Sequence, residues 1–162
     1  MTNARRKLIL IRHAKSAHPD GAEDFDRPLA DRGRRDAPAV GRWLRDNAYA
    51  IEAVRCSPAL RTRQTWELAR THIPAEPQVR FDERIYDATA QRLLEIVREL
   101  PVHAMTAALV GHNPGLEDLV HLLTGEPVQL KTSAVALLSS ERTWAEVGES
   151  WTCASTFAKP RG

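Results

Sequence analysis

Short apolar runs alternate with helical patterns along this 162-residue chain, and the alternation limits the folds that the chain can adopt. Apolar runs of this length, bounded by turn residues, are typical of buried strands. The runs predicted as strands are Leu8–Ile11, Ala53–Cys56, Val79–Phe81, Ala107–Val110, Ala134–Leu138 and Trp151–Phe157. Strands that alternate with helices favour a sheet that is mostly parallel.

The segments between these runs carry apolar side chains at helical spacing. One helix face is formed by Ala37, Val40, Gly41, Leu44 and Ala48. A second helix is predicted to begin at Ser57-Pro58, with serine as the N-cap, and to reach about Thr71. A third contains Leu93, Ile96, Val97 and Leu100 and stops at Pro101. A fourth begins at Asn113-Pro114 and ends at Gly125.

These elements predict an α/β fold, a three-layer α/β/α sandwich. Its sheet would be mostly parallel with an antiparallel edge strand, which the segment Glu126–Gly162 is expected to supply. The length suits one domain formed by residues 1–162. A domain of this size buries enough surface to fold without disulfides or a metal.

Composition excludes several classes of function. The net charge of +2 is too small to indicate a nucleic-acid binder. Cys56 and Cys153 lie far apart, which favours free thiols in a reducing compartment, and no Cys/His cluster suggests zinc. No apolar run approaches the ~20 residues of a membrane span or the ~7–15 of a signal peptide core. We therefore expect a cytoplasmic protein without metal, cofactor, nucleic-acid partner or membrane partner.

Charged side chains follow three of the predicted strands. Arg12 and His13 come directly after the first strand. Arg61 lies one turn into the helix after the second strand, and His112 follows the fourth. Because the carboxyl ends of parallel strands meet at one edge of the sheet, where ligands bind, we expect these four side chains to converge.

The chemistry of this group suits phosphoryl transfer. A guanidinium fork binds two oxygens of a phosphoryl group at once, and a neutral imidazole can attack phosphorus. Arg12 and Arg61 would keep His13 neutral, because a nearby positive charge lowers the pKa of an imidazole. No Walker loop is present to suggest a nucleotide site.

Four stretches of the chain, in this order, resemble the histidine phosphatase superfamily, which has the phosphoglycerate-mutase-like fold: LIRHAKS, RPLADRG, SPALRTRQT and LVGHNPGLEDL. The compact length and the RPL…G element make the chain most similar to SixA-type phosphohistidine phosphatases. The resemblance extends from about Leu8 to Leu119.

The resemblance implies a role for each matching residue. His13 would be the nucleophile that becomes phosphorylated, and Arg12 and Arg61 would bind the phosphoryl oxygens. His112 would complete the pocket and stabilise the transition state. Ser16 would add a hydrogen-bond donor. The implied substrate is phosphohistidine on a protein, such as a histidine phosphotransfer domain, or a small phosphate ester.

The chain departs from the family pattern at two places. The usual RHG is RHA, so Ala14 requires a negative φ. The mutases carry a general-acid glutamate in a stretch like LxExxxG, where FDERIYD has Glu83 but replaces the glycine by Asp87. Glu83 is thus a candidate general acid, and the alternative is a surface charge that pairs with Arg80 or Arg84.

The nature of the leaving group decides how much that acid matters. An alcohol is very basic and needs a proton as it departs, whereas imidazole has a pKa near ~6.5 and leaves more easily. An essential Glu83 would favour a phosphate ester, and a dispensable Glu83 would favour phosphohistidine.

Other interpretations remain open at this point. A mutase would need a closed pocket, for which the chain shows no lid insertion. A phosphate-binding module without catalysis and a nucleic-acid binder that uses the basic N-terminal run are further alternatives. Arg27, in DRPL, is interpreted mainly as a residue that pins its loop.

Overall fold

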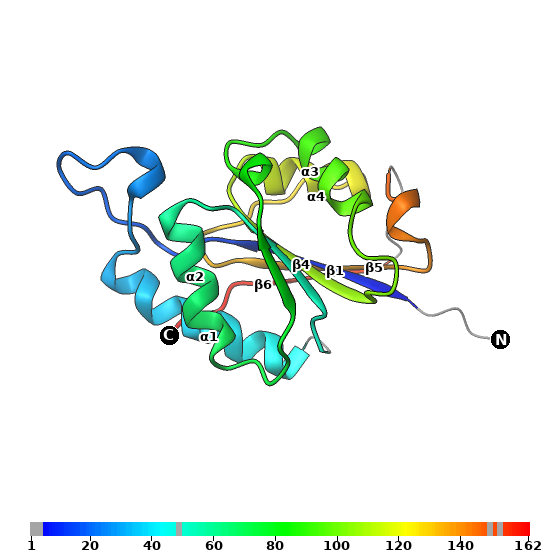
Figure 1. Ribbon diagram of the computed structural model, residues 1–162, viewed down its shortest axis with the longest axis horizontal. Helices are drawn as coiled ribbons and strands as arrows, with labels where there is room; N and C mark the ends of the chain where they lie inside the picture. The colour runs from blue at the N-terminus through cyan, green and yellow to red at the C-terminus, as the bar shows by residue number, and fades with distance from the viewer. Residues whose placement is uncertain (1–4, 48–49, 149–150, 152–153) are drawn as a thin grey trace.

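The computed structural model describes residues 5–47, 50–148, 151 and 154–162, and over these residues a six-stranded sheet forms the centre of the molecule (Figure 1). The strands are β1 Arg6–Arg12, β2 Ala53–Cys56, β3 Gln78–Phe81, β4 Thr106–Gly111, β5 Val135–Ser140 and β6 Ala154–Ala158.

The sheet is mixed, with the order β3-β2-β4-β1-β5-β6. The four strands on one side of it, β3, β2, β4 and β1, are parallel, whereas β5 is antiparallel to both of its neighbours. The predicted mostly parallel sheet is confirmed, with β6 as the edge strand that pairs antiparallel with β5.

The last strand begins later than predicted. β6 starts at Ala154, and Trp151 is buried just before it instead of pairing in the sheet. Thr152 and Cys153, which the prediction included, lie outside the described residues. The indole ring of Trp151 stacks on that of Trp144 with the ring centres 5.8 Å apart, so Trp151 contributes to the core and not to the sheet.

Helices cover both faces of the sheet and complete the three layers (Figure 1). They are α1 Asp31–Asn47, α2 Leu60–Arg70, α3 Ala90–Arg98 and α4 Gly115–Thr124, and three short 3-10 turns are η1 Asp24–Asp26, η2 Glu83–Ile85 and η3 Trp144–Glu146. In Figure 1, α1 and α2 lie on one face, and α3 and α4 lie on the other. No helix in the described ranges is long and apolar enough to cross a membrane.

The strands divide their side chains between the two faces. Ile9 and Ile11 pack with Val40 and Leu44 of α1, whereas Leu8 and Leu10 belong to the cluster that includes α3 and α4. This alternation follows from the two-residue period of a strand. It explains why the buried strand Leu8–Ile11 has an unbroken apolar sequence.

Helices α1 and α2 approach each other closely at Gly41 on α1. A β-carbon built at this position would lie 2.0 Å from the carbonyl oxygen of Ala69 on α2. Glycine therefore permits the contact, because any larger side chain would overlap the backbone of the neighbouring helix.

Two helices begin later than the cap-plus-proline signals predict. α2 begins at Leu60 with Ala59 as the N-cap, two residues after the predicted start. α4 begins at Gly115 with Pro114 as the N-cap. The serine and asparagine that precede these prolines bond elsewhere: Ser57 Oγ lies 2.7 Å from His112 Nε2, and Asn113 Nδ2 donates to Leu130 O.

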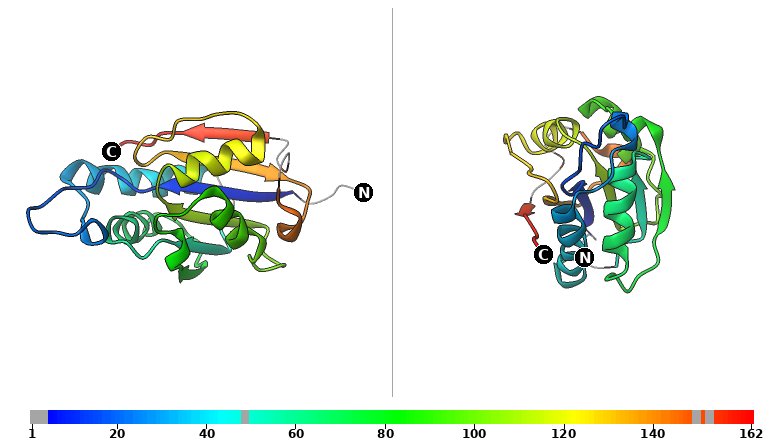
Figure 2. Two further views of the ribbon diagram at one scale, coloured as in Figure 1. Left: turned by 90° about the horizontal axis from the view of Figure 1, so that it is seen from above. Right: turned by 90° about the vertical axis from the view of Figure 1, so that its left-hand side faces the viewer.

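Segment 17–30 follows β1 and projects beyond the carboxyl end of the parallel strands (Figure 2). A bridge between Ser16 and Leu29 closes the base of this segment. Ala30 N also donates to Lys15 O at 2.9 Å. The segment is thereby positioned over the end of the sheet where β1, β2 and β4 terminate.

Candidate active site

Five of the six predicted site residues line one pocket of about 300 Å³ at the carboxyl end of the parallel strands. The lining residues are Arg12, His13, Lys15, Ser16, His18, Arg27, Arg61, His112, Asn113 and Thr132. The convergence expected from the strand order is therefore observed for both histidines and both arginines. Glu83 does not line this pocket.

The hydrogen bonds of His13 determine which ring nitrogen faces the pocket. Its Nδ1 lies 2.7 Å from the carbonyl oxygen of Ala14, which can only accept. Nδ1 must therefore carry the proton, and Nε2 of the neutral ring keeps its lone pair. The imidazole is 7% exposed, so the lone pair is sheltered from bulk water.

Ala14, which replaces the family's usual glycine, fits without strain. Among the described residues other than glycine, a positive φ occurs at Asp87 and Ser133, and not at Ala14. Ala14 N donates to Thr65 Oγ1 of α2 at 3.0 Å, which ties the residue after the nucleophile candidate to that helix. The expectation of a negative φ is confirmed.

Buried nitrogen atoms of the pocket residues lack partners. Among the described residues, Nε of Arg12, Nε of Arg61 and Nδ1 of His112 are buried without a hydrogen-bond partner. Buried polar atoms are nearly always satisfied in folded proteins, so unsatisfied ones at a pocket point to a bound group. Phosphoryl oxygens are acceptors of the kind that such nitrogens need.

His112 is oriented by Ser57 at the end of β2. Its Nε2 lies 2.7 Å from Ser57 Oγ, and Ser57 Oγ also accepts from Ala59 N at 3.3 Å. When the serine hydroxyl donates its hydrogen to Nε2, the ring proton lies on Nδ1, which is buried without a hydrogen-bond partner in the described structure. The rings of His13 and His112 lie 5.4 Å apart, so both reach the same bound group.

Burial keeps both histidines neutral. Burial, with the positive charges of Arg61, Arg12 and Arg27, lowers the pKa of His13 to about 4. Burial, with the proximity of His13 and Arg61, lowers the pKa of His112 to about 3. A neutral His13 is the form that can act as a nucleophile.

The pKa of His13 can be measured directly. We expect an NMR titration of the His13 ring to give a midpoint near 4, against the usual ~6.5 in the urea-unfolded chain. The unfolded chain then binds a proton that the folded protein does not. The free energy of unfolding should therefore decrease as pH falls from ~6.5 toward 4. A midpoint near 6.5 in the folded protein would contradict this account.

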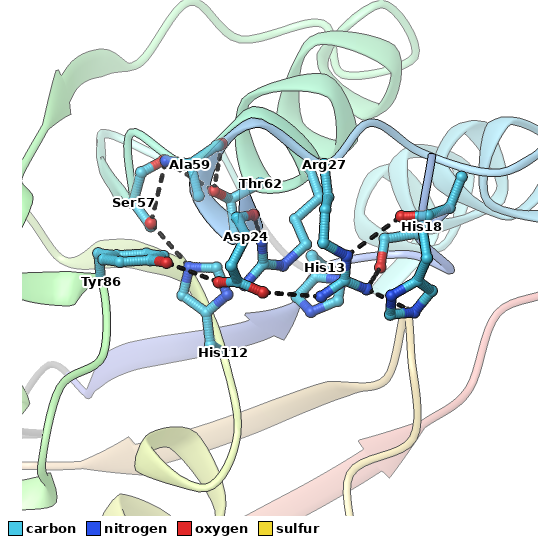
Figure 3. A network of polar contacts seen from close by, with 12 residues as sticks. His13, His18, Asp24, Arg27, Ser57, Ala59, Thr62, Tyr86 and His112 are labelled. Carbon is cyan, nitrogen blue, oxygen red and sulfur yellow. Dashed lines mark hydrogen bonds and ion pairs between the residues drawn. The ribbon is translucent and has the colours of Figure 1, made fainter. Parts of the chain in front are cut away.

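A carboxylate that the sequence analysis did not identify lies among the arginines of the pocket (Figure 3). Asp24 Oδ2 accepts from Tyr86 Oη at 2.6 Å and from Arg61 Nη2 at 3.1 Å, and Asp24 Oδ1 accepts from Arg27 Nη1 at 2.8 Å. Arg61 Nη1 also donates to the backbone oxygen of Asp24 at 2.7 Å. Asp24 therefore links segment 17–30 to α2 and to the end of η2.

Arg27 both lines the pocket and holds segment 17–30. Its Nε donates to Ala17 O at 3.1 Å, and its Nη2 donates to Ser16 Oγ at 2.5 Å. The same Nη2 lies 2.9 Å from His18 Nε2. The geometry agrees with the interpretation that Arg27 pins its loop, and it also places Ser16 in the pocket.

Glu83 lies outside the pocket. Its side chain is exposed and lines a separate hollow of about 420 Å³. The alternative pairing with Arg84 is not observed in the described structure, because Arg84 pairs with Asp82 and Glu99. Asp87, at the position of the family's glycine, has φ +55° and so keeps the left-handed backbone that glycine adopts easily.

The segment after α4 supports the site, although its sequence gave no functional signal. Leu130 O accepts from Arg12 Nη1 at 2.9 Å and from Asn113 Nδ2 at 2.7 Å. Ser133 N donates to His13 O at 3.0 Å. Residues 126–133 therefore hold the arginine and the backbone of the nucleophile candidate in place.

Metal binding and a reactive thiol each require particular side chains, and the described part of the chain can be compared with both requirements. No group of three or more His, Cys, Asp or Glu side chains there is arranged to hold a metal ion. Cys56 is buried at the end of β2, and burial raises the pKa of its thiol to about 12. Its thiol therefore stays protonated, and Cys56 is a free cysteine, as expected from the sequence.

The sheet order and the His/Arg pocket define a protein of the histidine phosphatase class. The family model of the histidine phosphatase superfamily (branch 1) matches residues 8–122, so the chain belongs to this superfamily. Membership in the superfamily supports phosphatase activity.

Similar proteins and structures indicate to which part of the superfamily the chain is related. The uncharacterised protein Rv1276c of Mycobacterium tuberculosis is 40% identical over 162 residues, which cover 93% of this chain and 100% of the relative. The structure of a protein assigned as phosphohistidine phosphatase SixA from Nakamurella multipartitia superposes with a TM-score of 0.76 at 30% identity, covering 94% and 95% of the two chains. A structure from Agrobacterium tumefaciens with the same assignment superposes with a TM-score of 0.78 at 27% identity, and the match covers 85% of this chain and 94% of the other. The chain is thus SixA-like.

Proposed function

We propose that the chain is a metal-independent phosphatase that removes phosphate from phosphohistidine on a protein, with a phosphorylated His13 as the intermediate. The observation that carries the proposal is the unprotonated Nε2 of His13, beside the buried and unpartnered nitrogens of Arg12, Arg61 and His112. A nucleophile and the donors for the phosphoryl oxygens thus share one pocket.

The first step transfers the phosphoryl group to the enzyme. Nε2 of His13 attacks phosphorus, the bond from phosphorus to the leaving group breaks, and its electron pair stays with the leaving group. Arg12 and Arg61 bind the phosphoryl oxygens, and Nδ1–H of His112 donates to the charge that develops in the transition state. Ser16 holds Arg27 at the rim of the pocket.

The second step returns His13 to its starting state. Water attacks the phosphorus of phosphorylated His13, the P–Nε2 bond breaks with its electron pair returning to Nε2, and inorganic phosphate leaves with the oxygen and the protons of the water. The ring keeps its Nδ1 proton, because the bond to Ala14 O is present throughout. His13 is neutral again and ready for the next substrate.

Two observations favour phosphohistidine over a phosphate ester. Glu83, the candidate acid for an alcohol leaving group, lines a different hollow. An imidazole leaving group needs less help from an acid. In addition, a second hollow of about 690 Å³ includes Phe25 and Pro58. Their neighbours in the sequence, Asp24 and Ser57, bond Arg61 and His112 of the pocket, so this hollow offers further surface to a protein substrate. The SixA assignment of the similar structures supports the same substrate.

The second candidate is a phosphatase of small phosphate esters that uses Glu83 as its general acid. The observation in its favour is the short distance along the chain from Glu83 to Tyr86, whose ring packs against His112 with the ring centres 5.5 Å apart. A rearrangement of η2 would carry Glu83 toward the pocket. A phosphate-binding module without catalysis is the remaining alternative.

Replacement of Glu83 separates these candidates. We expect Glu83→Gln to retain wild-type turnover of a phosphohistidine-bearing protein without added metal, because the side chain lies outside the pocket. The same variant is assayed on p-nitrophenyl phosphate. Glu76→Gln, an exposed glutamate before β3 at the opposite end of the sheet, is the matched control.

The outcomes assign the substrate class. Ester hydrolysis that exceeds phosphohistidine hydrolysis and depends on Glu83 would move the assignment to small phosphate esters. Binding of phosphate without turnover of either substrate would leave the binding module as the better description.

A further inference from the structure

Asp24 presents an acceptor beside Arg27 and Arg61, the two arginines of the phosphate pocket that it bonds. Of its two carboxylate oxygens, Oδ2 accepts from Tyr86 and Arg61, whereas Oδ1 accepts from Arg27 alone among the described residues. A carboxylate has about four acceptor sites, so Oδ1 can accept one more hydrogen bond. Two arginines and a tyrosine together hold the carboxylate in position, and Figure 3 shows Asp24 between Tyr86 and Arg27.

The leaving group of the proposed reaction must lie on the side of the pocket where Asp24 stands. Transfer to His13 is in line, so the leaving group departs on the side of phosphorus opposite to Nε2. His13 lines the pocket and is 7% exposed. The Asp24 side chain is 55% exposed and bonds the outer ends of Arg27 and Arg61. The carboxylate thus lies toward solvent, where a protein substrate enters.

The protonation state of a phosphohistidine ring decides how well it leaves. When the ring nitrogen that does not carry phosphorus is protonated, the P–N bond breaks to give neutral imidazole. Without that proton the leaving group is the strongly basic imidazolate anion. A phosphate ester has no N–H or positive charge at the equivalent position, so it would gain nothing from a carboxylate there.

We propose that Asp24 selects phosphohistidine by accepting a hydrogen bond from the N–H of the substrate's protonated imidazole ring. This inference rests on the proposed function and adds a specificity-determining residue to it. As the P–N bond breaks, its electron pair returns to the ring nitrogen that held phosphorus. The proton stays on the other ring nitrogen, so imidazole leaves neutral and Asp24 remains a carboxylate.

The surroundings of Asp24 suit an acceptor and not an acid. The hydroxyl of Tyr86, followed by the charges of Arg27 and Arg61, holds the pKa of Asp24 well below its usual range. The charged and titratable groups that face it are Arg27 of its own segment, Arg61 of α2 and Tyr86 after η2, with His112 behind the tyrosine. Asp24 thus stays ionised wherever the substrate ring is protonated.

The test compares two peptides of one sequence that carry either phosphohistidine or phosphoserine. Asp24→Asn keeps the shape and the Tyr86 contact but removes the charge. We expect kcat/KM for the phosphohistidine peptide to fall about tenfold or more, and kcat/KM for the phosphoserine peptide to stay equal or rise. Asp26→Asn, an exposed aspartate of the same 3-10 turn, is the matched control and should behave as wild type on both peptides.

The pH profile supplies a second measurement. A carboxylate raises the pKa of an imidazolium that it contacts. As pH is raised and the substrate ring loses its proton, kcat on phosphohistidine falls. In Asp24→Asn this fall should begin at a lower pH than in the wild type. Equal losses on both peptides, with an unshifted profile, would show that Asp24 only positions Arg61 and would overturn the proposal. An unchanged variant would overturn it as well. Wild-type protein that does not turn over the phosphohistidine peptide would overturn the proposed function itself, along with this inference.

Discussion

His13→Ala is expected to lower kcat/KM on phosphohistidine by about 10⁴-fold or more and to abolish the phosphorylated intermediate. The variant lacks Nε2 of His13, whose lone pair is left free because Nδ1 carries the proton and donates it to Ala14 O. Loss of the nucleophile removes the covalent route, and losses of this size are typical of such replacements. Incorporation of label from a ³²P-phosphohistidine substrate into the protein measures the intermediate directly.

The control separates loss of chemistry from loss of structure. His103→Ala removes an exposed imidazole in the loop after α3 and should retain both activity and labelling. Thermal melting of His13→Ala checks that the fold persists. Labelling of His13→Ala at the wild-type level would place the phosphoryl group on another residue and refute the assignment of the nucleophile.

Gly41→Ala is expected to destabilise the protein by about 3 kcal/mol. The new β-carbon would lie 2.0 Å from Ala69 O, so α1 and α2 must separate to accommodate it. Overpacking of a tight contact costs about 1–3 kcal/mol, and more where backbone must move. Helix propensity alone predicts that Gly41→Ala stabilises the protein, because alanine stabilises a helix by about 1 kcal/mol relative to glycine.

Urea unfolding of the variant measures the difference. Arg34→Ala, an exposed change on the same helix, should alter the free energy of unfolding by only a few tenths of a kcal/mol and serves as the control. A Gly41→Ala protein as stable as the wild type would show that the two helices can move apart freely.

The sequence was sufficient to predict the layers of the fold and the four residues at the strand ends. Leu8–Ile11 is a continuous apolar run because β1 is buried on both faces, and such runs are distinctive. The positions of Arg12 and His13 then follow from where the run ends. The SPALR and GHNPG stretches carry Arg61 and His112, so local pattern and family resemblance gave the same group of four.

The helix starts and the Asp24 network could not be predicted, because they depend on contacts between distant segments. Ser57-Pro58 has the pattern of a helix start, but the serine hydroxyl bonds both Ala59 N and the distant His112, and the helix begins only at Leu60. Asp24 and Tyr86 are separated by 62 residues and meet only when segment 17–30 lies against the end of β3. The weak available signal was the spacing of Asp24 three residues before Arg27.

The position of β1 in the sheet has a consequence for the order of folding. β1 pairs with β4, where Lys7 lies opposite Thr106, and with β5, where Arg6 lies opposite Ser140. Contacts between residues so far apart in sequence close slowly. On the ribosome, β1 gains its first neighbour only after Gly111 has been made and its second only after Ser140. A nascent chain therefore holds Arg12 and His13 long before the rest of the pocket can form around them.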